Sequence, residues 1–350
     1  MISLGPIGLA SSYPDTDDAA IVADEAQRIE SLGFSTLWRS GNLAMLDTSV
    51  RATTHIPVAT GIIPVDSVPA ADVIATYRSL QTDHAGRFIV GLGGAHGARP
   101  LKTLNAYRDA LDDAGITADS RILAALGTNM LALARDRASG AYPFLVTPSY
   151  VADARAALDA DKALAVLLMV MPTEREAARQ AAATPLGFLT KVGGYRRNLL
   201  RQGFSESDIE DLSDRLMDGI TAWGTLDAIA ARVAQYRAAG ADQVVLRILG
   251  TDAYRLSCPT PIASRASHAA ATPTPAPSTN HRHTGSLRQP HTVGARPPTA
   301  TKLSPTANNG CTRVSPRLST TMAAAVTAAT NAATVSPIAQ GVESSVTARA

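Results

Sequence analysis

The sequence predicts an α/β protein built as a (β/α)8 TIM barrel, and three observations lead to this fold. Short apolar segments rich in Val and Ile alternate with longer Ala-rich segments of helical period from Met1 to about Thr251. Eight apolar segments occur in this stretch, and about 250 residues is the usual size of such a barrel. At five junctions a glycine stands between a helical segment and the next apolar segment, as expected for repeated αβ units. An open doubly wound sheet would usually have fewer strands.

The eight expected strands follow in order along the chain. They lie within residues 3–9, 31–38, 56–62, 84–93, 113–127, 138–146, 163–171 and 238–249. Five of these ranges begin with the end of the preceding helix, where a glycine would take the left-handed conformation of a helix cap. These glycines are Gly33, Gly86, Gly115, Gly140 and Gly240.

Residues 172–223, after the seventh strand, are expected to form a helical insertion. The stretches 173–183 and 205–220 are amphipathic, and Ser205 with Asp208 resembles a capping box. Long insertions after barrel strands often cover the substrate pocket. Three aromatic residues are therefore candidates for a lid, with ordinary packing as the alternative: Tyr195, Phe204 and Trp223.

Composition divides the chain into a barrel domain at residues 1–252 and a tail at residues 253–350. The first part has 23 basic and 29 acidic residues, whereas the tail has nine basic residues and one acid, Glu343. Pro, Thr, Ala and Ser dominate the tail, which we expect to be disordered because it cannot bury enough apolar surface. Pro259 and Pro261 interrupt the helix expected to cover the last strand. The abrupt change suggests that a reading-frame change or a fusion replaced the natural end.

Several classes of protein are excluded by the same counts. The two cysteines, Cys258 and Cys311, both lie in the tail, so a disulfide framework is not expected. No apolar run reaches the roughly 20 residues that span a bilayer, and the N-terminus lacks the basic start of an export signal. We therefore expect a cytoplasmic protein without membrane contact. A specific nucleic-acid partner is not expected either, because the barrel part is acidic. The sequence is compatible with a homodimer and does not decide the oligomeric state.

Few acid or base side chains follow the expected strands, where barrel enzymes place their chemistry. His55 and His84 precede strands, so only His96 lies at the active rim, and one histidine does not make a metal site. No lysine ends a strand, and strands two to six end in hydroxyls, glycines and backbone. Such a rim suggests that a bound cofactor, and not a side chain, carries out the reaction on a small-molecule substrate.

The loop GLGGAHGARP at residues 91–100 departs from a dinucleotide fingerprint, because His96 stands where the last glycine belongs. Gly91, Gly93 and Gly94 would let backbone approach a flat ligand, with His96 at its edge. A flexible loop with a solvated histidine is equally compatible with this sequence.

Two other strand ends are candidate binding sites. Gly127, Thr128 and Asn129 open a helix whose first N–H groups suit a phosphate, although the local sequence alone favours Thr128 as a simple N-cap. The stretch 60–64 has small residues followed by apolar ones, which fits a bulge against a ring system or a plain strand end.

The barrel part resembles the luciferase-like monooxygenase superfamily, and more closely its actinobacterial branch of probable coenzyme F420-dependent oxidoreductases. The resemblance covers roughly residues 3–251 and depends on six segments in the order of the family. They are LGFSTLW (32–38), VATGI (58–62), RFIVGLGGAH (87–96), ILAALGTNMLALARDRASGAYPFLVTP (122–148), GFSESDIEDLSDRLMDGI (203–220) and GTLDAIAARVAQYRAAGADQVVL (224–246).

The resemblance implies a flavin or deazaflavin held edge-on at the mouth of the barrel. A non-prolyl cis peptide after strand three would support the ring, and here that position maps to Thr60, Gly61 and Ile62. The phosphate of the cofactor would lie at the helix after strand five. Four residues match that position: Gly127, Thr128, Asn129 and Met130.

The expected function is hydride transfer between F420 and an unidentified small organic substrate, with His96 as the proton donor. Several F420 enzymes of the superfamily carry an acid and a histidine after strand two, where this chain reads Trp38-Arg39-Ser40-Gly41-Asn42. A proton-transfer role for that loop is therefore not expected. The alternatives are an FMN-dependent monooxygenase and a non-catalytic barrel.

Overall fold

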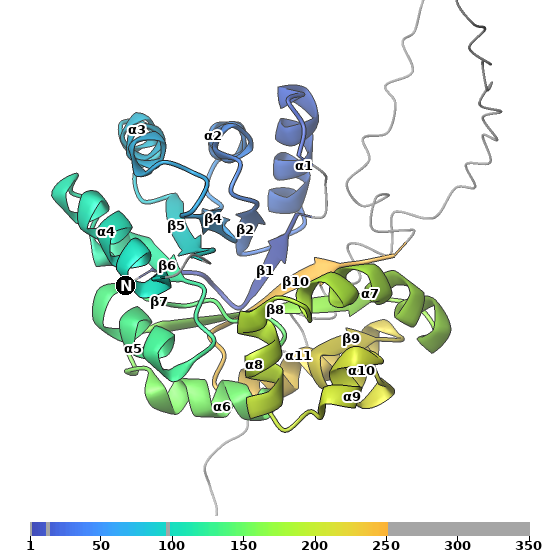
Figure 1. Ribbon diagram of the computed structural model, residues 1–350. Coiled ribbons are helices and arrows are strands. Elements are labelled where there is room, and N and C mark those ends of the chain that lie inside the picture. Colours follow the sequence, from blue (N-terminus) through green and yellow to red (C-terminus); the bar gives the residue numbers. More distant parts are fainter. Residues whose placement is uncertain (1, 12–14, 96–98, 251–350) are drawn as a thin grey trace, which may run out of the picture. The chain divides into compact units, whose positions relative to one another are not determined.

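The computed structural model describes residues 2–11, 15–95 and 99–250, and Figure 1 shows their arrangement. The expectations for the tail at 253–350, for the covering of the last strand and for His96 lie outside these residues.

Eight parallel strands close into a barrel, as the sequence predicted. The strands are β1 (Ile7–Ala10), β2 (Thr36–Arg39), β3 (Val58–Thr60) with its continuation β4 (Ile63–Pro64), β5 (Phe88–Gly93), β6 (Arg121–Leu123), β7 (Gly140–Ala141), β8 (Ala163–Met171) and β10 (Gln243–Ile248). Each strand pairs with the next, and β10 pairs in parallel with both β1 and β8. The last strand therefore closes the barrel.

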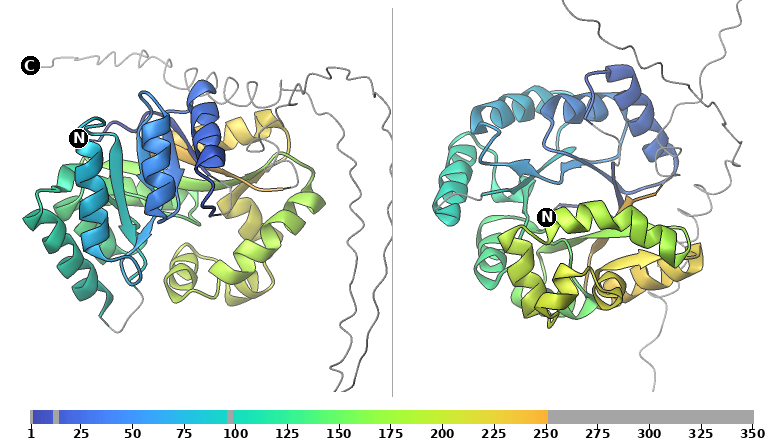
Figure 2. Two further views of the ribbon diagram at one scale, coloured as in Figure 1. Left: turned by 90° about the horizontal axis from the view of Figure 1, so that it is seen from above. Right: turned by 45° about the vertical axis from the view of Figure 1, so that its right-hand side comes forward.

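Helices surround the strands (Figure 2). They are α1 (Ala19–Ser31), α2 (Leu43–Ala52), α3 (Ala70–Gln81), α4 (Pro100–Asp113), α5 (Thr128–Arg137), α6 (Pro148–Ala157) and α11 (Leu226–Ala238), and a short 3-10 turn at Ala118–Ser120 precedes β6. Side-chain caps begin several of them, for example Asp18 at α1 and Asn42 at α2. Within residues 2–11, 15–95 and 99–250, no helix is both long and apolar enough to cross a membrane.

The expected insertion after the seventh barrel strand is present. It comprises α7 (Arg175–Leu189), α8 (Gly193–Arg201), α9 (Glu206–Glu210), α10 (Asp214–Ile220) and β9 (Thr221–Trp223). The strand β9 pairs with the end of β8 between Met169 and Met171. Ser205 and Asp208 form the predicted capping box at α9.

Two apolar layers form the core, one on each side of the strands. The outer layer contains alternate strand residues such as Val58, Leu168 and Val244 together with the inner faces of the helices. The inner layer contains Trp38, Ile122 and Val245 and continues into the insertion helices. Burial on both faces explains the nearly continuous apolar runs of these strands.

One of the five glycine caps was predicted wrongly. Gly33, Gly86, Gly115 and Gly240 have positive φ angles, but Gly140 is the first residue of β7. A Cβ atom on Gly140 would lie 1.9 Å from the carbonyl oxygen of Ala163 on β8. Glycine stands here because two strands approach closely, whereas α5 ends at Arg137 and its C-cap residue Ala138 has an extended conformation.

Candidate active site

The third barrel strand is interrupted at the predicted ring-binding segment. β3 ends at Thr60, the peptide bond between Gly61 and Ile62 is cis, and pairing resumes in β4. The cis bond is the one that the family resemblance implied. The Thr60 hydroxyl donates to the Gly91 carbonyl oxygen at 3.0 Å and accepts from the Gly91 N–H at 2.9 Å. These bonds join the segment to β5.

The end of β5 lies against this segment. A Cβ atom on Gly93 would lie 3.1 Å from the Cδ1 atom of Ile62, and one on Gly94 would lie 3.0 Å from Cα of Pro64. Gly94 has a φ angle of 72°. The structure thus brings Thr60, Gly61 and Ile62 together with Gly93 and Gly94 at the carboxyl ends of adjacent strands.

Two stacked aromatic rings lie beside Gly61 inside the barrel. The ring centroids of Trp38 and Tyr142 are 4.0 Å apart and their planes differ by 9°. A Cβ atom on Gly61 would be 3.0 Å from the phenolic oxygen of Tyr142. Burial raises the pKa of Tyr142 well above its usual range, and the charge of Arg247 opposes this only in part. The phenol therefore keeps its proton at neutral pH.

The helix α5 begins without a side-chain cap. Its N-cap residue is Gly127, and no side chain accepts from the first N–H groups. Thr128 is the first helical residue, so the simple capping role considered from the sequence is wrong. Thr128 and Asn129 are exposed, and Gly127 and Met130 are half-buried. The first N–H groups are thus available to an anion.

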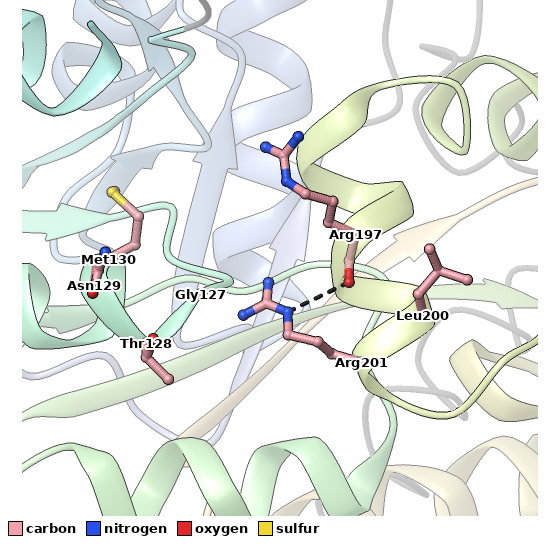
Figure 3. A pocket seen from close by; sticks show the side chains of 7 residues that line it. All are labelled: Gly127, Thr128, Asn129, Met130, Arg197, Leu200 and Arg201. Atoms are coloured by element: carbon pink, nitrogen blue, oxygen red, sulfur yellow. Dashed lines mark hydrogen bonds between the residues drawn. The ribbon is translucent and has the colours of Figure 1, made fainter.

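Two arginines of the insertion face this helix start (Figure 3). Gly127, Thr128, Asn129 and Met130 line a pocket of about 450 Å³ together with Arg197, Leu200 and Arg201 from α8. The Arg201 guanidinium points towards Gly127, and a Cβ atom there would lie 3.2 Å from its Nη1 atom. In the part of the chain that the structure describes, neither arginine forms an ion pair with a carboxylate, and the Nε atom of Arg201 donates to the carbonyl oxygen of Arg197 at 3.4 Å.

Sequence reasoning missed Tyr142, Arg197 and Arg201. The arginines stand in the run YRRNLLR, whose helical spacing places Arg197 and Arg201 on one face. That pattern alone does not say which strand end the helix faces. Tyr142 comes directly after the two-residue strand β7, and only the folded barrel shows that its ring belongs to the inner apolar layer.

Arg39, the last residue of β2, directs its side chain towards the helices α1 and α2. Its side chain is 1% exposed and pairs with Glu25 of α1, which is 4% exposed. Arg39 also donates to the Ser49 hydroxyl at 2.8 Å on α2. The residue therefore fastens two helices to β2.

The three lid candidates have different surroundings. Phe204 is buried against Gly219 and under Arg215, so it packs between insertion helices. The ring of Tyr195 contacts Phe144 edge-on at 6.0 Å between centroids. Trp223 is half-buried beneath the Arg175 guanidinium and donates to Asp218 at 2.9 Å. Packing accounts for Phe204, whereas Tyr195 and Trp223 are partly accessible.

No cluster of three His, Cys, Asp or Glu side chains that would suit a metal ion occurs among the described residues. The polar groups near the start of α5 are instead backbone N–H groups and the guanidinium groups of Arg197 and Arg201 on α8. This set suits an anionic organic ligand.

Solved structures with the same fold come from enzymes of two cofactor classes. An F420-dependent secondary alcohol dehydrogenase in complex with an F420-acetone adduct matches 73% of this chain and 96% of its own, with 15% identity and a TM-score of 0.55. The coenzyme F420-dependent tetrahydromethanopterin reductase from Methanopyrus kandleri matches 72% and 96%, with 14% identity and a TM-score of 0.57.

A third structure carries FMN. The oxygenating constituent of 3,6-diketocamphane monooxygenase from Pseudomonas putida, in complex with FMN, matches 71% of this chain and 93% of its own, with 13% identity and a TM-score of 0.50. No protein-family model matches the chain, and no curated protein sequence matches it at a significant level. At 13–15% identity these likenesses concern the fold, and they show that the protein has the same (β/α)8 barrel as these three enzymes.

Proposed function

We propose that the protein is an oxidoreductase that binds coenzyme F420 and exchanges a hydride with a small organic substrate. The observation that carries this proposal is the uncapped start of α5 facing Arg201, at the same barrel end as the cis Gly61–Ile62 peptide bond. The sequence resemblance to the F420 branch favours a deazaflavin over a flavin.

The residues at the start of α5 fit a phosphate group. Uncapped N–H groups at a helix start bind anions through hydrogen bonds and the helix dipole. Arg197 and Arg201 add two positive charges across a pocket of about 450 Å³, and guanidinium groups bind phosphate in a bidentate manner. Gly127, Thr128, Asn129 and Met130 would hold the phosphate from the other side.

The segment between β3 and β5 fits the edge of a flat ring. Gly61, Gly93 and Gly94 have no side chains, and neighbouring protein atoms fill the space that a Cβ atom would need, so the two strand ends pack closely and hold the segment in place. Thr60 holds the segment through its two bonds to Gly91. Ile62 is half-buried and would contact the ring.

When bound, F420 supplies a ring that accepts or donates a hydride. The protein orients the ring, keeps water away with the inner apolar layer, and holds a protonated phenol at Tyr142 beside Gly61. His96 remains the proton donor expected from the sequence, and Tyr142 is a second group that can hold or deliver a proton. The His96→Gln and Tyr142→Phe variants separate the two, since the true donor is the one whose loss lowers turnover but not cofactor affinity.

FMN with oxygen, in a monooxygenase, is the alternative chemistry for the same site. One structure with this fold was solved in complex with FMN, and both cofactors present a tricyclic ring and a phosphate. The relative affinities of the protein for F420 and FMN decide between the two cofactors.

Titration of the purified full-length protein with F420, FMN and NADPH tests the proposal, with ligand fluorescence and thermal unfolding followed together. We expect F420 to bind most tightly and to raise the melting temperature, because a ligand that binds only the folded state stabilises it. Preference for FMN would replace hydride transfer by oxygen chemistry. Absence of binding by both F420 and FMN would favour a non-catalytic barrel and contradict the proposal.

A further inference from the structure

Arg247 is a charged residue inside the barrel that the proposed cofactor site does not use. Residues of a strand alternate between its two faces. Val244, Leu246 and Ile248 of β10 belong to the outer apolar layer, whereas Val245 belongs to the inner layer. Arg247 therefore shares the inward face of β10 with Val245.

The guanidinium of Arg247 lacks a counterion in the described part of the chain. Its Nε atom is buried and has no hydrogen-bond partner there. The residue opposite Arg247 on β8 is Met169, and Leu167 stands opposite Val245, so its strand neighbours inside the barrel are apolar. A partly buried cation among apolar side chains is costly unless an anion accompanies it.

Two phenols belong to the inner side of the barrel that Arg247 faces: Tyr142 is part of the inner apolar layer with Val245, and Tyr195 packs against this layer. Burial raises the pKa of Tyr142 and of Tyr195 on α8, and in both cases the charge of Arg247 opposes the rise. Both phenols therefore stay protonated and can donate hydrogen bonds. Asn198 follows Tyr195 by three residues on the same side of α8, is 1% exposed, and has no partner for either amide atom among the described residues.

The order of the strands separates Arg247 from the proposed cofactor contacts. In the closed barrel, β1 and β2 lie between β10 and β3, and β7 and β8 lie between β10 and β6. The proposed ring segment follows β3 and the phosphate pocket follows β6. Arg247 thus stands on the arc of the barrel opposite the cofactor segments, where a second ligand would lie.

We propose that the substrate carries a carboxylate group, which Arg247 binds inside the barrel with hydrogen bonds from Tyr142 and Tyr195. A guanidinium matches the planar carboxylate in charge and shape. One cation in apolar surroundings suits a singly charged acid better than a phosphate with two charges. This inference rests on the proposed function, since it names the substrate class of that oxidoreductase.

Binding of matched acids and amides to the full-length protein tests the inference. Trp38 stacks on Tyr142 and the chain has only two tryptophans, so a Trp223→Phe background leaves Trp38 fluorescence as a local reporter. The probes are phenylacetate and hexanoate, each compared with its primary amide. We expect each acid to bind at least about tenfold more tightly than its amide, as a charge-assisted pair predicts.

Variants of Arg247 then test whether this residue causes the preference for the acid over the amide. In Arg247→Met the acid and the amide should bind equally, whereas Arg247→Lys should keep part of the preference. Arg179→Met, which removes an arginine that forms a partly exposed ion pair with Asp214 of α10, should change nothing. Equal affinity for acid and amide in the parent protein, no quenching by either acid up to its solubility limit, or an unchanged preference in Arg247→Met would each overturn the inference.

A cofactor titration of Arg247→Met keeps this inference distinct from the proposed function. We expect unchanged F420 affinity. A loss of F420 affinity with an intact acid preference would assign Arg247 to the cofactor and overturn the inference. Failure of the parent protein to bind any cofactor would refute the proposed function, while the acid preference would still be decided by its own titration.

Discussion

Gly91 shows how a single residue sets the geometry of the ring-binding segment. A Cβ atom at this position would lie 1.8 Å from the carbonyl oxygen of Thr60. The absence of a side chain lets β3 and β5 approach closely, and the Thr60 hydroxyl bridges to both backbone groups of Gly91. Any side chain here must separate the two strands.

We expect Gly91→Ala to lower the free energy of unfolding by at least about 2 kcal/mol, because the backbone must move to admit a methyl group. Chemical denaturation measures the change. Gly187→Ala on α7 is the matched control, since open space surrounds its Cβ position, and alanine should stabilise this helix slightly. Similar effects for both substitutions would contradict the close approach.

Arg201 is the residue whose loss should weaken phosphate binding most. We expect Arg201→Met to reduce cofactor affinity about tenfold, because it removes one charge-assisted contact. Fluorescence titration with F420 measures the affinity. Arg215→Met serves as the control, because the guanidinium of Arg215 lies over Phe204. Equal affinities of the parent and Arg201→Met would remove Arg201 from the site.

At the scale of elements, buried polar contacts fasten the helices to the first strands. Arg39 at the end of β2 pairs with Glu25 on α1 and donates to Ser49 on α2. Glu30, near the end of α1, accepts hydrogen bonds from the backbone of Thr54, His55 and Ile56 before β3. These contacts join elements that are distant in sequence.

Glu25→Ala should destabilise the protein by about 3–5 kcal/mol, since it leaves the Arg39 charge buried and unpaired. Thermal or chemical unfolding measures this. Glu206→Ala removes an exposed ion pair with Arg196 and should change stability by less than about 1 kcal/mol. A small effect at Glu25 would show that water or another group compensates Arg39.

Glu30 predicts an acid-dependent loss of stability. Burial alone would raise its pKa, but hydrogen bonds from the backbone of His55, Ile56 and Thr54 lower the pKa of Glu30 to about 2. A carboxyl whose folded pKa is lowered stabilises the protein above its unfolded value of 4.5, and this contribution is lost as the pH falls towards 2.

Glu30→Gln should therefore cost roughly 1–2 kcal/mol at pH 7, and the difference from the parent should shrink below about pH 4. Urea unfolding between pH 7 and pH 3 measures both proteins. Glu176→Gln on the outer side of α7 is the control. A difference that stays constant over this range would show that Glu30 does not titrate as its contacts indicate.

At the scale of the whole molecule, the first and last strands depend on each other. Gln243 at the start of β10 donates to the carbonyl oxygen of Leu4 at 2.5 Å and accepts from the indole N–H of Trp38 at 2.9 Å. β10 also pairs with β1 and with β8. The barrel therefore closes only when the first and the last strands are both in place.

The barrel could be predicted from sequence because its signals are local. Buried parallel strands are apolar throughout, and helix ends such as Gly33 and the Ser205–Asp208 box have short signatures. The close approach at Gly140 was not predictable, because the same glycine also suits a helix end. Its actual role depends on a carbonyl group of Ala163, which belongs to another strand.

The site was only partly predictable for a similar reason. The segments 60–62 and 127–130 were found from strand ends and the family resemblance, but α8 reaches the start of α5 only through the folded insertion. Arg247 did leave a signal, since it is the only charged residue of β10 and shares the inward face with Gln243 and Val245. A charge on the inner face of a barrel strand would have identified it.

A crystal structure of the full-length protein with bound F420 would test the central claim, the location of the cofactor, most directly. The account predicts the cofactor phosphate at the N–H groups of Thr128, Asn129 and Met130, within hydrogen-bonding distance of Arg201. It also predicts that the ring edge lies against Gly61 and Ile62. A structure with the phosphate or the ring bound elsewhere, or crystals that take up no F420 at saturating concentration, would contradict the account.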